Sequence, residues 1–159
     1  MKADTILGIN PGTRRIGIAV MRKQALVYFE IKSFQGTWSR KKLHNIISFL
    51  ASVLKQYDVT KVTVKIPDTL PASLGFTQLI GSLNALCEHT GIRPRYYTFS
   101  EIKARHCRED APTGVSLMAA IVDKHPELWP EYRREQKNEE GYYHKIFEAV
   151  AVARMVRKK

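Results

Sequence analysis

Three short apolar segments follow one another near the start of the chain, at residues 5–9, 16–20 and 25–31, with no helical pattern between them. Their length and composition are those of β-strands. A 3.6-residue apolar repeat then predicts an amphipathic helix over residues 39–57, N-cap included, and residues 59–66 alternate as a fourth strand. Consecutive strands can pair antiparallel, whereas a strand, helix, strand unit pairs its strands in parallel. The sequence therefore predicts a mixed sheet.

The rest of the chain continues the alternation of helix and strand. Leucines at helical spacing predict a second long helix, which begins at Leu74 and ends near Gly91. The remaining expected elements are a fifth strand at 93–99, short helices at 101–106 and 115–122, a polar surface connection at 126–141 and a last helix at 142–156. No convincing linker divides the sequence. We expect one α/β domain over residues 1–159, with a mixed five-stranded sheet, the first three strands antiparallel, and helices on both faces.

The charge balance indicates a polyanionic partner. The 159 residues include 26 Lys and Arg against 15 Asp and Glu, which gives a formal net charge of +11. Such an excess attracts polyanions and speeds their encounter, so nucleic acid is the first partner to expect. The basic residues lie in clusters, and the candidate nucleic-acid contacts are Arg14, Arg15, Arg40, Lys41 and Lys42.

The compartment is predicted from what the sequence lacks. No apolar run approaches the roughly 20 residues that cross a bilayer, and the first apolar patch is too short for a signal-peptide core. Cys87 and Cys107 stand apart without the spacing of a disulfide framework or a zinc site, and both are expected to be reduced thiols. We therefore expect a cytoplasmic protein with no membrane contact.

Residues 6–20, with the sequence ILGINPGTRRIGIAV, resemble the opening hairpin of the RuvC Holliday junction resolvases. The pattern in that family is an apolar strand, Asp-Pro-Gly, a polar turn, then Gly and a second apolar strand. Asn10 stands here in the place of the Asp. Residues 62–66 resemble the strand that ends with a catalytic Glu, and residues 145–153 are similar to the final helix. The resemblance implies a ribonuclease H-like fold, which has the order of elements predicted above.

In that family, carboxylates from the first strand, the fourth strand and the last helix hold two Mg²⁺ ions, which activate the attacking water and stabilise the leaving oxygen. Carried over one position at a time, these acids become Asn10, Lys65 and, for the first acid of the helix pair, Lys145 or the preceding His144. Glu148 alone remains acidic. Because the ammonium of Lys65 repels a cation, we expect it to pair with Glu148 instead. The resemblance thus implies a nucleic-acid-binding protein with impaired or absent metal-dependent cleavage and no required cofactor.

Two other interpretations remain open. An active crossover-junction endonuclease could use Mg²⁺ or Mn²⁺ in a rearranged site built from Asp68, Glu148, His144 and Asn10, with Asp68 and Glu148 as the acidic metal ligands. A protein-interaction scaffold would use none of these residues on nucleic acid. A salt bridge from Lys65 to Glu148 favours the binding protein or the scaffold over the endonuclease. The nucleic-acid partner implied by the resemblance is structured or branched DNA, and the resemblance also suggests a homodimer.

Overall fold

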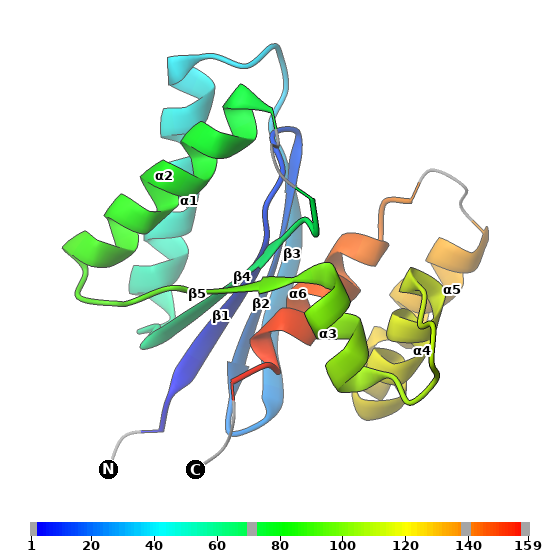
Figure 1. Cartoon of the computed structure of the whole chain (residues 1–159). Helices are drawn as coiled ribbons and strands as arrows, with labels where there is room; N and C mark the ends of the chain where they lie inside the picture. The colour runs from blue at the N-terminus through cyan, green and yellow to red at the C-terminus, as the bar shows by residue number, and fades with distance from the viewer. Residues whose placement is uncertain (1–2, 70–72, 138–140, 157–159) are drawn as a thin grey trace.

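The computed structural model describes residues 3–69, 73–137 and 141–156, and a five-stranded sheet forms its centre (Figure 1). The strands are β1 Thr5–Asn10, β2 Arg15–Arg22, β3 Ala25–Ser33, β4 Lys61–Ile66 and β5 Arg95–Thr98, in the order β3-β2-β1-β4-β5. β2 pairs antiparallel with both β1 and β3, whereas β4 lies parallel to both β1 and β5. The predicted mixed sheet, with its first three strands antiparallel, is confirmed.

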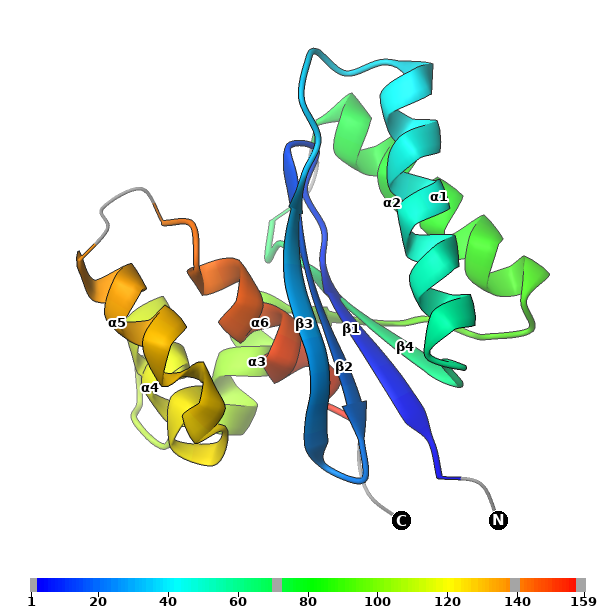
Figure 2. The ribbon, with the colours of Figure 1, turned by 180° about the vertical axis from the view of Figure 1, so that it is seen from behind.

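Helices cover both faces of the sheet, as predicted (Figure 2). One face carries α1 Arg40–Gln56 and α2 Leu74–His89, and the other carries α3 Phe99–His106, α4 Gly114–Lys124, α5 Trp129–Lys137 and α6 His144–Ala153. Alternate side chains of β4 lie on opposite faces of the sheet. Val62 and Val64 pack in the core under α1 and α2, while Lys65 contacts α6 on the opposite face.

α6 lies directly against the sheet, and eight successive residues, 146–153, are buried. Two glycines permit this close approach. A Cβ on Gly8 of β1 would overlap the carbonyl oxygen of Ala149, and one on Gly17 of β2 would lie 2.5 Å from that of Lys145. A larger residue at either position would push α6 away from the strands. The glycines therefore help to set the distance between the strand ends and the side chains of α6.

The prediction of a surface connection over residues 126–141 is wrong for residues 126–137. These form a 3-10 turn, Pro126–Leu128, and then α5. Leu128 is fully buried, and the ring of Tyr132 packs edge-on against Phe147 of α6 with the centroids 6.0 Å apart. α5 has no fully buried residue, so its sequence lacks the apolar stripe by which a helix is recognised. Residues 138–140 lie outside the described part of the chain.

The expected strand at 93–99 and helix at 142–156 are both shorter in the structure. β5 ends at Thr98 because its hydroxyl accepts from the N–H of Glu101 and so caps α3. Before α6, the N–H of Tyr143 donates to Oε1 of Glu135 at 2.9 Å, and Tyr143 makes no side-chain capping bond to the helix. After it, the N–H of Arg154, the C-cap residue, still donates to the carbonyl of Val150. A side-chain cap therefore marks the change from β5 to α3, whereas α6 begins without one.

Among the described residues, no helix is both long enough and apolar enough to cross a bilayer. Cys87 is buried in the core under α1 and α2, Cys107 is partly buried, and both are free thiols, as expected. Burial raises the pKa of Cys87 to about 11. Because the thiolate is the reactive form, this cysteine is chemically inert at neutral pH.

His106, the last residue of α3, is expected to make the fold sensitive to acid. Its Nε2–H donates to the carbonyl of Ala151 at 2.8 Å, and burial is the main cause that lowers its pKa to about 4 from 6.5. Between these two pH values the unfolded chain binds a proton at His106 that the folded chain does not. The free energy of unfolding therefore falls as pH falls from 6.5 toward 4, by at most about 3.5 kcal/mol at about 1.4 kcal/mol per pKa unit.

The variant His106→Gln keeps an N–H donor for Ala151 but cannot titrate. Urea denaturation at pH 7 and pH 5 should show a smaller loss of stability on acidification for this variant than for the parent chain. An equal loss in both proteins would show that His106 does not account for the acid sensitivity.

Candidate functional site

The structure assembles the predicted cluster where β1 and β4 end against α6. Asn10 is the last residue of β1, Lys65 lies one residue before the end of β4, and Glu148 is in α6. Nζ of Lys65 and Oε1 of Glu148 form an ion pair, with side chains 19% and 7% exposed. Nδ2 of Asn10 donates to the same oxygen at 3.1 Å. The expected ion pair between Lys65 and Glu148 is therefore present, and it shares its carboxylate oxygen with Asn10.

An aromatic ring completes the surroundings of the Lys65 ammonium. Nζ of Lys65 lies 4.2 Å from the ring centroid of Phe99, the first residue of α3, and Nζ of Lys103 lies 4.5 Å from the same centroid. A cation over an aromatic face is attracted by the ring quadrupole. Phe99 was not among the predicted site residues, since nothing in its local sequence indicates that α3 begins beside the end of β4.

His144 lies between two carboxylates. Its Nδ1 is 3.4 Å from Oε2 of Glu135, and its Nε2 is 3.9 Å from Oε2 of Glu148. Glu135 belongs to α5, a helix that was not predicted from the sequence, and its side chain is only 8% exposed. The structure thus brings a second acid close to the predicted site. Even so, within residues 3–69, 73–137 and 141–156 no group of three or more His, Cys, Asp or Glu side chains is arranged to hold a metal ion.

Asp68, an expected metal ligand, contacts the start of α3. Its Oδ1 accepts from the N–H of Ser100 at 2.9 Å and its Oδ2 accepts from the Ser100 hydroxyl at 2.8 Å. The first of these hydrogen bonds is the main cause that lowers the pKa of Asp68. Both oxygens are thus engaged in holding the first turn of α3, and the structure does not bring Asp68 into the cluster of Asn10, His144 and Glu148.

The donor set at the end of β1 and β4 does not fit a pair of divalent ions. Mg²⁺ prefers oxygen ligands, above all carboxylates, in near-octahedral geometry. In the cluster of Asn10, Lys65 and Glu148, Glu148 supplies the carboxylate. Its Oε1 already accepts from the Lys65 ammonium and the Asn10 amide. Lys65 adds a positive charge within contact distance of that oxygen. A divalent ion at this place would have to displace both donors and tolerate the ammonium.

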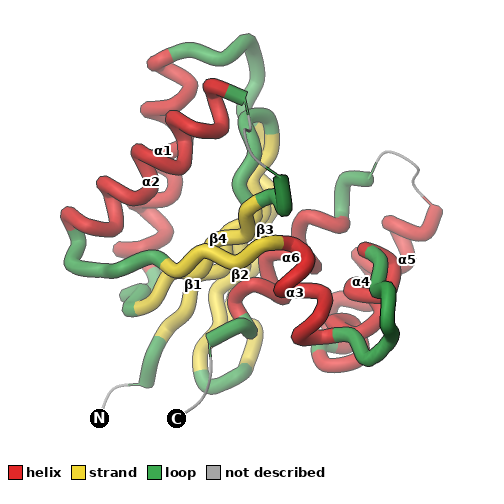
Figure 3. The backbone as a smooth tube through the Cα atoms, in the orientation of Figure 1, coloured by secondary structure: helices red, strands yellow, loops and turns green. Residues whose placement is uncertain are grey.

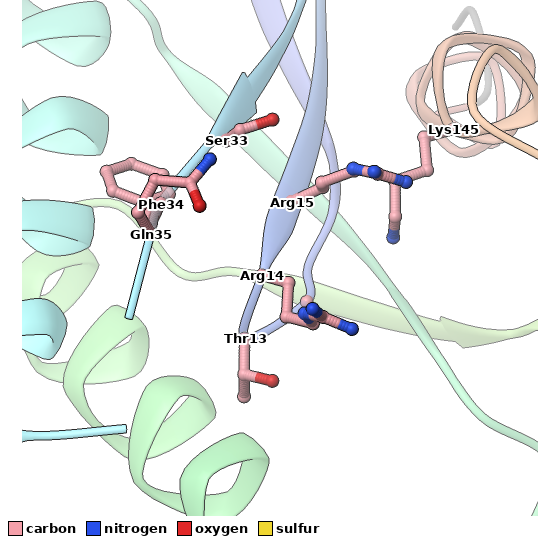
Figure 4. Close-up of a pocket in the computed structure, with 8 residues that line it drawn as sticks. Thr13, Arg14, Arg15, Ser33, Phe34, Gln35 and Lys145 are labelled. Atoms are coloured by element: carbon pink, nitrogen blue, oxygen red, sulfur yellow. The ribbon is translucent and has the colours of Figure 1, made fainter. Parts of the chain in front are cut away.

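A basic cleft of about 400 Å³ lies beside this cluster, between the β1–β2 turn, the end of β3 and the first turn of α6 (Figure 4). Its lining consists of Gly12, Thr13, Arg14, Arg15, Ser33, Phe34, Gln35 and Lys145. Two predicted nucleic-acid contacts, Arg14 and Arg15, therefore lie next to the predicted site residue Lys145. The guanidinium of Arg15 lies 4.9 Å from the ring centroid of Tyr142.

The remaining basic candidates lie at the start of α1, at the same end of the molecule as the β1–β2 turn (Figure 3). Arg40 and Lys41 are exposed there. Lys42 differs from its prediction, because its side chain is buried and its Nζ donates to the carbonyl of Gly36 at 2.8 Å. Lys42 thus stabilises the loop before α1, and its ammonium is not exposed to solvent as the charged groups of Arg40 and Lys41 are.

Three solved structures resemble the chain over nearly its whole length. Thermus thermophilus RuvC gives a TM-score of 0.71 at 13% identity, covering 94% of this chain and 90% of that chain. T. thermophilus RuvC in complex with Holliday junction substrate gives 0.69 at the same identity and coverage. The yeast mitochondrial Holliday junction resolvase Ydc2 gives 0.67 at 10% identity, covering 96% of this chain and 77% of that chain. At these identities the likeness shows the fold, and the expected ribonuclease H-like architecture is confirmed.

A family model gives the stronger assignment. The model described as crossover junction endodeoxyribonuclease RuvC matches residues 6–108, which include β1 except for its first residue, β2 to β5, and both α1 and α2. None of the curated proteins matches the chain. Because the family model covers more than half of the residues, this chain belongs to the RuvC family of crossover junction endodeoxyribonucleases.

Proposed function

We propose that this chain is a RuvC-like protein that binds branched DNA and does not cleave it by the metal-dependent route of its family. The observation that carries the proposal is the Lys65–Glu148 ion pair, to which Asn10 adds a hydrogen bond. The ammonium of Lys65 and the amide of Asn10 both donate to Oε1 of Glu148, an oxygen that would be needed to coordinate a metal ion. The cluster is therefore expected to serve as an internal structural contact and leave binding to the surrounding basic residues.

The net charge of the chain and its similarity to a DNA-bound structure both support DNA as the partner. The chain has a net charge of +11. Arg14 and Arg15 line one cleft, and Arg40 and Lys41 are exposed at the start of α1, which lies at the same end of the molecule (Figure 3). One similar structure is of T. thermophilus RuvC in complex with Holliday junction substrate. We transfer the branched DNA of that complex to this chain as the proposed ligand, because phosphate contacts by Lys and Arg need no sequence-reading motif.

The test is a four-way junction, with a linear duplex of the same length as the control. We expect the chain to bind the junction in EDTA, and we expect no cleavage product after addition of Mg²⁺ or Mn²⁺. Fluorescence anisotropy measures the binding and a denaturing gel measures the cleavage. Robust metal-dependent cleavage that is abolished in Glu148→Ala would contradict the proposal and favour the endonuclease with a rearranged metal site.

Binding should also depend steeply on salt, because the contacts are mainly with phosphates. If six or more phosphates are engaged, affinity is expected to fall by about 10³-fold or more between about 50 and 200 mM salt. An affinity that does not respond to salt, or no binding at low salt, would favour a protein-interaction scaffold. The homodimer suggested by the family resemblance stays a prediction, which sedimentation analysis of the chain would check.

A further inference from the structure

The basic cleft beside the β1–β2 turn has a lining whose charge favours an anion. Three of its lining side chains, Arg14, Arg15 and Lys145, are cationic, and none is acidic. Figure 4 shows Lys145 reaching down from α6 on the side of the cleft where the two arginines extend. Gly12, Thr13, Ser33, Phe34 and Gln35 line the rest. Two segments far apart in the sequence, the β1–β2 turn with the start of β2 and the first turn of α6, thus place positive charge around one cavity.

Lys145 lacks a counterion within the described residues, although an acid lies one turn away on the same helix. Glu148 pairs with Lys65 and Asn10 instead, and among the residues that the structure describes no hydrogen bond or ion pair reaches Nζ of Lys145. Burial is the main cause that lowers the pKa of Lys145; Glu148 opposes the shift, and nearby Lys65 and Arg15 add to it. An ammonium in this position is stabilised by any anion that enters the cleft.

The ammonium of Lys145 lies close to the backbone of the turn. A Cβ on Gly12 would lie 2.6 Å from the carbonyl oxygen of Arg15 and 3.2 Å from Nζ of Lys145, so the glycine allows the turn to close tightly beside the ammonium. Arg15 is oriented separately, by the face of the Tyr142 ring. An arginine held in this way keeps a planar set of N–H donors, which suits the oxygens of a phosphate, and the lysine supplies a point charge.

We propose that this cleft binds one phosphate group of a nucleic-acid strand and that Lys145, with Arg14 and Arg15, holds it without a divalent ion. The inference rests on the proposed DNA binding for its biological ligand, but the subsite itself can be tested with phosphate alone. The positive charge that a metal pair would bring to a phosphate comes here from side chains. Both an internal phosphodiester and a terminal phosphate ester have this chemistry, and the experiment separates them.

The variants are Lys145→Gln, Lys145→Arg and the control Lys55→Gln, which removes the same charge from the exposed last turn of α1. Inorganic phosphate is titrated into each protein and followed by NMR of the backbone amides, and junction binding is measured in EDTA. Lys145→Gln is expected to lose the phosphate-induced shifts at residues 12–15 and to weaken junction binding by about tenfold or more, the effect of losing a hydrogen bond to a charged group. Lys145→Arg should retain most of both, and the control should change junction affinity by less than about threefold.

The source of the phosphate is identified with single strands that carry or lack a 5′-phosphate. A Lys145-dependent preference for the phosphorylated strand supports a terminal phosphate, whereas equal Lys145-dependent binding supports an internal phosphodiester. The proposal is overturned if Lys145→Gln, folded as judged by its amide spectrum, binds phosphate and junction like the control, or if the parent chain needs Mg²⁺ to bind. Phosphate binding without any junction binding would keep the subsite and reject the proposed function.

Discussion

A variant that carries Asn10→Asp, Lys65→Glu and Lys145→Asp together is expected to bind divalent ions that the parent chain does not bind. With Glu148, these changes place four carboxylates where β1 and β4 end against α6. Without a cation the four acids repel one another, and a bound Mg²⁺ or Mn²⁺ relieves that repulsion while gaining oxygen ligands. The effect is large because the changes remove two ammonium groups from the site and add three acids.

Calorimetric titration of Mg²⁺ and Mn²⁺ measures this gain, and thermal unfolding gives a second readout. A ligand that binds only the folded state stabilises it by about 2.7 kcal/mol when its concentration is about 100 times its dissociation constant. The melting temperature of the triple variant should therefore rise with Mg²⁺, while that of the parent chain should not. Cleavage of a junction is not expected from the variant, because reactive groups must be placed to about 0.5 Å.

The single variant Asn10→Asp is the matched control. It restores the acid of β1 but leaves the ammonium of Lys65 at the site. Two unit charges about 4 Å apart repel by roughly 4 kcal/mol at an effective dielectric constant of about 20, and a divalent ion roughly doubles this energy. The single variant should therefore bind no ion. Metal binding by the parent chain as strong as that of the triple variant would contradict our interpretation of the site.

The sheet and the cluster of Asn10, Lys65 and Glu148 could be predicted because each depends on a pattern within a short stretch of sequence. Alternation along Val62 and Val64 indicates a strand without knowledge of its partners. The hairpin around Asn10 has a composition that resembles one family, so the positions of Lys65 and Glu148 could be carried over from that family. The structure then placed all three in contact. The short distance between β1, β2 and α6 also has a sequence signal, since Gly8 and Gly17 remove the side chains that would hold the helix away.

The parts that could not be predicted depend on contacts between distant segments. α5 has almost no apolar face, and it is recognised as a helix only once Tyr132 is seen against Phe147. Phe99 joins the cluster through its position over Lys65, and Lys42 is withdrawn from the surface by the carbonyl of Gly36. A charge cluster in the sequence does not show which of its members have internal partners. This is why Arg40 and Lys42, two residues apart, have different environments.

The variant Glu148→Ala is expected to lower the free energy of unfolding by about 3 kcal/mol. Removing one partner of a buried ion pair leaves the other charge without compensation, which commonly costs about 3–5 kcal/mol. The lower end of that range applies because Lys65 is still 19% exposed and keeps its contact with the ring of Phe99. The amide of Asn10, which is 3% exposed, also loses its acceptor. Urea denaturation at neutral pH measures the change.

A double-mutant cycle with Lys65→Met separates the ion pair from the cavity that Glu148→Ala creates. Methionine keeps the apolar stem of Lys65 and removes the ammonium, so Glu148 retains Asn10 as its donor. The double variant should be more stable than the sum of the single losses predicts, by about 1–3 kcal/mol, because contacting charges couple. Additivity within about 0.5 kcal/mol would show that the two charges do not stabilise one another. A buried ion pair adds little net stability compared with apolar residues of the same size. A strong coupling energy between Lys65 and Glu148 is therefore compatible with a small net contribution to the free energy of unfolding. In that case the role of Lys65 is to neutralise Glu148, which would otherwise be a buried charge without a partner.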